Sequence, residues 1–195
     1  MPAAPSPPER DAPPRSAPVL GIGGAPAAHQ RPPPRARAPD LDGARDYDAI
    51  FQIVRASVRR VLGRERAGLG LALSDLPASL GAYWQVTGNI IVLNESLVRA
   101  MDRRAGSPRE RNAFVYVVLL HEYLHALGFL SEESVRPVTA RVARETFGPE
   151  HPASRMAAGD LWRMYPFLAD VPSGTGRWMR MVSGFDSASV ASYIR

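Results

Sequence analysis

The chain has 195 residues, 45% of them hydrophobic, and it contains no cysteine. This length accommodates one ordinary domain with an extension. The lack of cysteine excludes disulfides, iron–sulfur clusters and Cys-ligated zinc, so any transition-metal site must use imidazole and carboxylate groups. The formal net charge is +5, and all 24 basic residues are arginine. This charge permits an acidic or nucleic-acid partner, although the arginines are scattered along the chain rather than massed.

Residues 1–40 differ in composition from the rest of the chain. They hold 12 of the 19 prolines, five arginines and few large apolar residues. Because such a segment buries too little surface to offset its chain entropy, we expect a disordered tail over residues 1–40 and a folded domain over residues 41–195. The N-terminus has no long apolar run, so we expect no secretory signal. His121, Glu122 and His125 interrupt the longest apolar run of the chain, so we also expect no membrane partner. A cytoplasmic location is therefore expected.

The first half of the domain predicts one helix and a β-hairpin. Apolar residues recur at helical spacing from Asp46 to Leu62, and Gly63 follows as a stop signal. Residues 69–77 predict a short strand. The runs AYWQV and IIVLN, separated by residues 87–89, predict a hairpin. Asn94 is suited to cap a short helix that continues to about Asp102.

The clearest local signal opens a long helix at Ser107. The sequence Ser107-Pro108-Arg109-Glu110 supplies an N-cap serine, a proline at the first helical position and a glutamate that closes a capping box. The apolar pattern then runs to Leu127, and Gly128 is suited to end the helix. Further helices are predicted from Ser131 to about Phe147, from Pro152 to Tyr165 and from Asp186 to Ile194.

The end of the long helix carries the sequence HEYLH, residues 121–125. Two histidines four positions apart differ by about 40° in direction and about 6 Å in rise, so His121 and His125 can bind one ion. Glu122 is rotated by about 100° and flanks that ion, where it can accept a proton. The pattern H-E-x-x-H thus predicts a Zn²⁺ site with Glu122 as its catalytic base. Two satisfied core histidines are the alternative.

A catalytic zinc ion takes three protein ligands and keeps one open position. The metzincin pattern H-E-x-x-H-x-x-G-x-x-H matches up to its glycine, but its last position is Ser131, a poor ligand. His151, the remaining histidine of the folded part, would complete an all-histidine set and is our preferred third ligand. Glu145, 20 residues after the second histidine, is the alternative. Glu132 and Glu133 rank lower, because acidic residues favour the first turn of a helix.

With these motifs, residues 69–151 resemble the zincin metallopeptidases, in particular the minimal ones. In zincins a hairpin ahead of the active-site helix provides an edge strand along which a peptide lies extended, and the hairpin of residues 82–93 is similar. The spacing to Glu145 is like that of the thermolysin-type gluzincins. A histidine after a glycine-containing loop, as in residues 147–151, is instead similar to SprT-like zincins.

The resemblance implies an α+β fold, mainly helical, with a small mixed or antiparallel sheet packed on the H-E-x-x-H helix. It also implies a zinc-dependent metallopeptidase in which zinc activates water and Glu122 is the general base. A peptide or protein substrate would bind at Ala82, Tyr83 and Trp84, although the side chains of Tyr83 and Trp84 equally suit packing within the hairpin. Two other functions stay open: a zinc-stabilised binding module whose Arg-rich tail engages an acidic partner or nucleic acid, and a pseudoenzyme that holds peptide without cleaving it.

Overall fold

The computed structural model describes residues 39–186. Most of the tail predicted for residues 1–40 and the whole helix predicted after Asp186 lie outside these residues. Within the described range, no helix is both long and apolar enough to cross a membrane.

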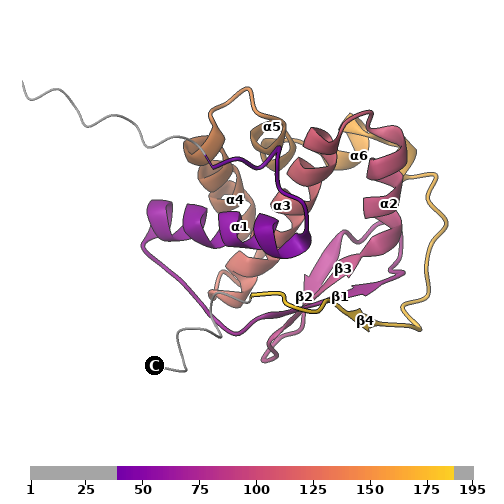
Figure 1. The fold of residues 1–195 in the computed structure, drawn as a ribbon, viewed down its shortest axis with the longest axis horizontal. Coiled ribbons are helices and arrows are strands. Elements are labelled where there is room, and N and C mark those ends of the chain that lie inside the picture. Colours follow the sequence, from indigo (N-terminus) through magenta and orange to yellow (C-terminus); the bar gives the residue numbers. More distant parts are fainter. Residues whose placement is uncertain (1–38, 187–195) are drawn as a thin grey trace, which may run out of the picture. The chain divides into compact units, whose positions relative to one another are not determined.

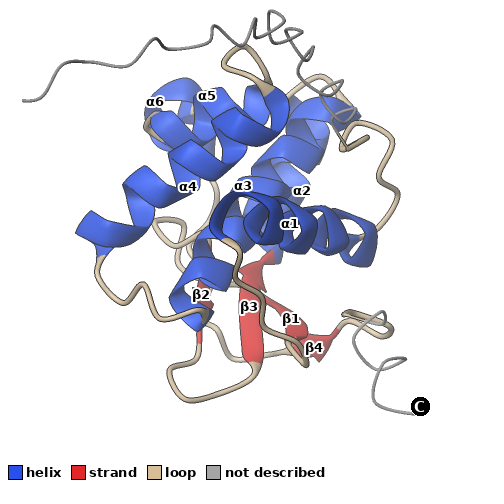
Figure 2. Ribbon diagram, turned by 90° about the vertical axis from the view of Figure 1, so that its left-hand side faces the viewer, coloured by secondary structure: helices blue, strands red, loops and turns tan. Residues whose placement is uncertain are grey.

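The described residues form an α+β fold in which helices pack on a small sheet (Figures 1 and 2). The helices are α1 (Tyr47–Leu62), α2 (Glu95–Arg104), α3 (Pro108–Ala126), α4 (Glu132–Phe147), α5 (Pro152–Ala158) and α6 (Leu161–Met164), followed by a 3₁₀ turn, η1 (Pro166–Leu168). The strands are β1 (Gly70–Ser74), β2 (Ala82–Trp84), β3 (Ile90–Asn94) and β4 (Arg180–Met181).

The sheet is mixed, with the strand order β2-β3-β1-β4. Strands β2 and β3 form the predicted antiparallel hairpin, whereas β1 and β3 are parallel. Parallel strands are normally covered on both faces and read as continuous hydrophobic runs; in β1 and β3 every residue after the first is buried. Strand β2 lies at the edge of the sheet next to α3 (Figure 2).

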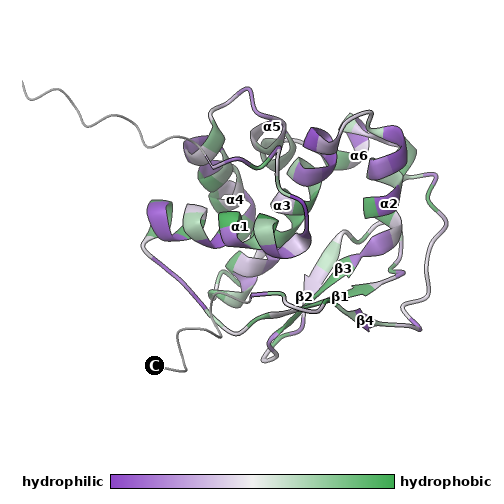
Figure 3. Ribbon diagram, viewed as in Figure 1, coloured by the Kyte–Doolittle hydropathy of each residue, from purple (hydrophilic) through white to green (hydrophobic). Residues whose placement is uncertain are grey.

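Helix α3 is the centre of the fold and contacts α1, α2, α4, α5, β2 and β3. Every residue from Asn112 to Leu120 is buried, as expected of a helix that is apolar on all sides. Its N-terminus has the predicted cap, in which Ser107 Oγ accepts the Glu110 N–H at 3.3 Å. In Figure 3, β1 and β3 are coloured mainly as hydrophobic and the C-terminal end of α1 as hydrophilic. The two ends of α3 approach the surface: Pro108 and Arg109 are exposed in its first turn, and His121 and His125 are half-buried near its end.

The helix predicted from Pro152 to Tyr165 is not continuous. Helix α5 ends at Ala158, and Gly159 has an extended backbone. Asp160 then caps α6 by accepting the N–H of Trp162 at 2.9 Å. The break follows from local chemistry, because glycine has a low helix propensity and aspartate favours the N-cap position over the helix interior.

Candidate metal centre

The chain reverses direction between α3 and α4 at Gly128. The φ angle of Gly128 is 98°, a region that glycine enters without steric cost. The N–H of Phe129 donates to the carbonyl of Leu124 at 3.1 Å, which closes α3 in a Schellman-type arrangement. Ser131 caps α4 with its side chain, so that Glu132 is the first residue of α4. The reversal therefore returns Glu132 to the last turn of α3.

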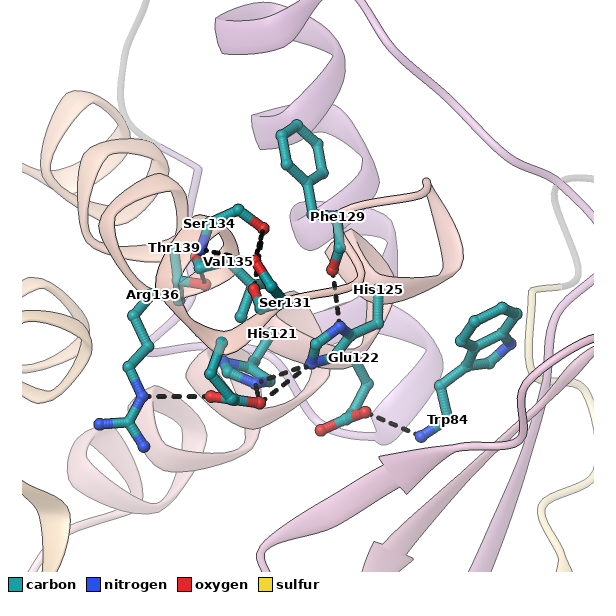
Figure 4. Close-up of polar contacts among 11 residues, drawn as sticks. Trp84, His121, Glu122, His125, Phe129, Ser131, Ser134, Val135, Arg136 and Thr139 are labelled. Atoms are coloured by element: carbon teal, nitrogen blue, oxygen red, sulfur yellow. Dashed lines mark hydrogen bonds and ion pairs between the residues drawn. The ribbon is translucent and has the colours of Figure 1, made fainter.

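Three potential ligand atoms converge at this junction (Figure 4). The Nε2 atoms of His121 and His125 lie 3.1 Å apart, and Oε1 of Glu132 lies 3.3 Å from each of them. Ligand atoms bound to tetrahedral zinc at ~2.0–2.1 Å are about 3.3 Å from one another, so the three atoms fit a zinc ion. Among the described residues, these three side chains are the group of His and acidic residues that could hold a metal ion.

Neighbouring groups fix the orientation of two of these three side chains. Nδ1 of His125 lies 2.7 Å from the carbonyl oxygen of Phe129. It donates its proton there, which leaves the Nε2 lone pair free for a metal. Arg136, one turn further along α4, holds the other carboxylate oxygen of Glu132 with an Nε–Oε2 distance of 3.1 Å (Figure 4). Both contacts are of the kind that orients metal ligands in proteins.

The surroundings also set the protonation of the site. Desolvation by burial lowers the pKa of His121, which favours the neutral imidazole. Desolvation acts to raise the pKa of Glu132, but the hydrogen bond from Arg136 and the neighbouring His121 outweigh it, so this pKa lies below its usual value. A neutral imidazole and an ionised carboxylate are the forms that bind a metal ion.

Glu122 lies beside these three side chains and is buried, with 7% of its surface exposed. Its Oε2 atom accepts the main-chain N–H of Trp84 in β2 at 2.8 Å (Figure 4). Desolvation by burial raises the pKa of Glu122 to about 7, against the opposing effects of His125 and the Trp84 N–H. The carboxylate thus joins the last turn of α3 to the edge strand.

A cleft of about 1150 Å³ opens over these residues. Its walls are β2 with the three residues before it, the second half of α3, the first half of α4 and residues 156–162. In the hairpin, Asn94 N–H donates to the Gly81 carbonyl and Gln85 N–H to the Ile90 carbonyl. Because main-chain groups alternate in direction along a strand, those of Ala82 and Trp84 point away from β3.

The three residues predicted to bind substrate form β2 and line this cleft. The side chain of Tyr83 lies on the sheet face away from α3, because its partner Val92 belongs to a small apolar cluster outside the main core. The indole of Trp84 donates to the Gly88 carbonyl within the same hairpin at 3.1 Å. The Trp84 side chain therefore packs within its own hairpin, as the alternative interpretation has it. The part of β2 that faces away from β3 is its main chain.

His151 does not join the histidine pair. Its Nδ1 accepts the Ala153 N–H at 3.1 Å at the start of α5, and its Nε2 lies 3.4 Å from Oδ1 of Asp42. The ring also stacks on Phe147, with the ring centroids 4.6 Å apart. Both ring nitrogens thus have protein partners, and Glu132 occupies the place beside the pair that the sequence predicts for His151.

Glu145 is also outside the group. It lies on α4 beyond Glu132, at a distance of about 20 Å along the helix axis from the rise per residue. Its Oε1 atom accepts from Nε of Arg141 at 2.8 Å, and its side chain is half exposed. Glu145 is thus a solvent-exposed residue on the surface of α4.

The approach of Glu132 to the histidine pair depends on the reversal at Gly128, which the sequence alone does not place in space. The useful signal was the partial metzincin pattern, which ends at Ser131, one residue before Glu132. The carboxylate directly after the mismatched position is the one that the structure brings to the histidine pair.

Searches against protein-family models, curated proteins and solved structures gave no match to this chain. The assignment of the site therefore depends on the geometry given above and on general chemistry.

Proposed function

We propose that this protein is a zinc-dependent metallopeptidase in which His121, His125 and Glu132 hold the metal and Glu122 is the general base. One observation carries the proposal: three ligand atoms lie 3.1 to 3.3 Å apart beside a buried carboxylate on the wall of a cleft. Two imidazoles and one carboxylate form a donor set that catalytic zinc uses, with a fourth position open. Zinc bound there would supply Lewis-acid polarisation of a carbonyl group and acidify a water molecule.

Glu122 has the placement of a general base. The Trp84 N–H fixes Oε2, so Oε1 is the oxygen left to accept a proton from water. The same carboxyl group then donates this proton to the amine that leaves when the peptide bond breaks. Because Glu122 lies one residue beyond His121 on the helix, its side chain is rotated by about 100° and flanks the proposed metal ligands instead of joining them.

The outer edge of β2 supports an extended peptide as substrate. The N–H and C=O of Ala82 and the C=O of Trp84 point away from β3, and a peptide strand can pair with such an edge. Exposed apolar side chains line the cleft, among them Leu80 (38% exposed), Val86 (69%) and Leu130 (71%). Main-chain pairing with an apolar rim favours an unfolded or flexible protein segment over a folded surface.

A cytoplasmic location is part of the proposal and is tested by cell fractionation.

The test compares the wild-type protein with the Glu122→Gln variant, and with Glu145→Gln as a matched control. We expect one zinc per chain in all three proteins, by elemental analysis after purification. Wild type and the control should hydrolyse denatured casein or a library of quenched fluorescent peptides, and Glu122→Gln should not. Full activity in Glu122→Gln would show that Glu122 is not the base. Fe(II) also binds to two histidines and a carboxylate, so iron in place of zinc would contradict the assignment as a hydrolase.

The two other functions give different results in this experiment or in a deletion of the tail. A pseudoenzyme would bind zinc and peptide in the wild-type protein without cleaving the peptide. A binding module that depends on its tail would lose its acidic partner or nucleic acid on deletion of residues 1–40, whereas the peptidase would keep its activity.

A further inference from the structure

Arg66 lies in the connection between α1 and β1, and its main chain is tied to α3. The N–H of Arg66 donates to the hydroxyl of Tyr123 at 2.7 Å, and this hydroxyl donates to the carbonyl of Arg66 at 3.1 Å. Tyr123 is fully buried and directly follows Glu122 in α3. The position of the Arg66 backbone is therefore fixed relative to the turn of α3 that carries the proposed base.

The guanidinium group of Arg66 joins the end of α3 to the β2–β3 hairpin. Nη1 donates to the carbonyl of Ala126, the last residue of α3, at 2.8 Å. Carbonyls at a helix C-terminus lack intrahelical partners and favour a cation. Nη2 donates to the carbonyl of Gly88 at 3.2 Å and to Oδ1 of Asn89 at 2.7 Å, both in the hairpin turn. The same group lies over the ring of Trp84, 5.4 Å from its centroid.

Two connections therefore link α3 to the hairpin. One is the hydrogen bond from the Trp84 N–H to Glu122, and the other is the Arg66 guanidinium, which contacts the ring of the same tryptophan. Arg66 contacts none of the three proposed metal ligands through any of these bonds. Its planar fork reaches acceptors in two elements at once, which the single ammonium group of lysine reproduces poorly.

We infer that Arg66 is a positioning residue, which holds the β2–β3 hairpin on the end of α3 and so sets where a peptide on β2 lies relative to Glu122. The inference rests on the proposed function, since it concerns the same cleft. Placement of a substrate within a fraction of an ångström of its reactive position strongly affects rate. Loss of Arg66 should therefore reduce turnover while the metal stays bound.

The experiment compares Arg66→Ala and Arg66→Lys with Arg60→Ala as the matched control. Arg60 also donates from its guanidinium to a helix carbonyl, that of Glu145 at 3.0 Å, but it joins α1 to α4 and does not touch the hairpin. Elemental analysis should find one zinc per chain in every variant. This first measurement separates the metal site from the position of the hairpin.

The second measurement is amide hydrogen exchange by NMR in the metal-free protein, which requires no activity. Exchange at the Trp84 amide should become about 10- to 100-fold faster in both Arg66 variants, the range expected for lost hydrogen bonds of a charged donor. Exchange at Leu119, inside α3, should not change. Arg60→Ala should leave the Trp84 amide as in wild type. An equal acceleration at Leu119 and Trp84 would mean that Arg66 only stabilises the fold and would overturn the inference.

The third measurement is the kinetics of peptide hydrolysis. In Arg66→Ala, kcat should fall by about 10- to 100-fold, more than KM changes, because the peptide still binds but is misplaced. Values of kcat and Trp84 exchange within twofold of wild type would contradict the inference.

If Arg66→Ala does not fold, Asn89→Ala removes one hairpin acceptor and should give a smaller acceleration of amide exchange at Trp84. Absence of hydrolysis in the wild type would refute the proposed function, and hydrogen exchange would then decide the role of Arg66 alone.

Discussion

Histidines lie both at the α3–α4 junction and at the start of α5, but their ring nitrogens have different surroundings. At the junction, the Nε2 atoms of His121 and His125 face each other and a carboxylate at 3.1 to 3.3 Å. At the start of α5, the two ring nitrogens of His151 are used by a backbone N–H and by Asp42. Three potential ligand atoms converge at the junction, and none joins His151 in such a group among the described residues, so counting histidines does not identify ligands.

Helix α4 provides the same contrast for carboxylates. Glu132 and Glu145 each pair with an arginine four positions away, at 3.1 and 2.8 Å. Glu132 still offers its second oxygen to the histidines, whereas Glu145 lies almost four helical turns away from them. The difference between the two lies in tertiary position, since their local chemistry is similar.

The largest expected effect comes from removing a histidine of the pair. His125→Ala should lower zinc affinity by at least about 100-fold, because changes to groups that only orient a ligand already cost 10–100-fold. His151→Asn, the matched change at the start of α5, should leave zinc affinity unchanged. Competition titration with a fluorescent zinc chelator measures both. Equal losses in the two variants would show that His151 is also a ligand.

The next effect separates the two carboxylates of α4. Glu132→Gln should weaken zinc binding by about 100-fold, since it removes the negative charge and one direct ligand, while Glu145→Gln should not change it. The same titration serves, with circular dichroism to verify that both variants fold. A loss confined to Glu145→Gln would restore the gluzincin-like arrangement.

A smaller effect is expected from the arginines that hold these carboxylates. Arg136→Gln should weaken zinc binding by about tenfold because it frees Oε2 of Glu132. Arg141→Gln breaks the equivalent pair with Glu145 and should leave zinc binding as in wild type. Exposed pairs of this kind add only about 0.3–0.5 kcal/mol to stability, so the melting temperatures of both variants should stay close to wild type. Zinc binding that is unaffected by Arg136→Gln would show that Arg136 does not orient the ligand.

The smallest effect concerns the pH dependence of stability at His151. Burial lowers the pKa of His151 from 6.5; Asp42 opposes this shift and Arg109 adds to it. Because the folded-state pKa lies below the unfolded value, the stability that the neutral ring provides is present above about pH 6.5 and is lost as pH falls through the folded pKa. Protonation also removes the lone pair that accepts the Ala153 N–H.

The matched variant for this prediction is His151→Asn, which keeps an N-cap side chain but does not titrate. Urea unfolding of the metal-free proteins at pH 7.5 and pH 5.5 should show wild type losing up to about 1 kcal/mol relative to the variant, the usual value of an N-cap. Parallel losses in wild type and variant would assign the pH dependence to other groups.

The sequence predicted the local elements well and their long-range arrangement poorly. Helix α3, its cap at Ser107 and its end near Gly128 follow from signals within a few residues, and so does the β2–β3 hairpin. The parallel pairing of β1 with β3 and the addition of β4 depend on contacts between segments far apart in the chain, which no local pattern encodes. The Gly159-Asp160 pair indicates a break between two helices, but the apolar residues on either side continue at helical spacing and predict one continuous helix.

The same limit applies to the candidate site. His121, Glu122 and His125 belong to one helical turn, so their relative directions follow from helix geometry alone. The third member depends on how the chain turns after Gly128. The metzincin pattern points to Ser131, but the turn brings the next residue, Glu132, to the histidines. The role of Arg66 is likewise not predictable from the sequence, because its partners in α3 and the hairpin lie far from it along the chain.

The most direct test of the central claim is a crystal structure of the zinc-loaded protein with anomalous diffraction at the zinc edge. The account predicts one strong anomalous peak at about 2.0–2.2 Å from Nε2 of His121, Nε2 of His125 and Oε1 of Glu132. A peak between His151 and Asp42, or no ordered zinc within reach of the histidine pair, would contradict it.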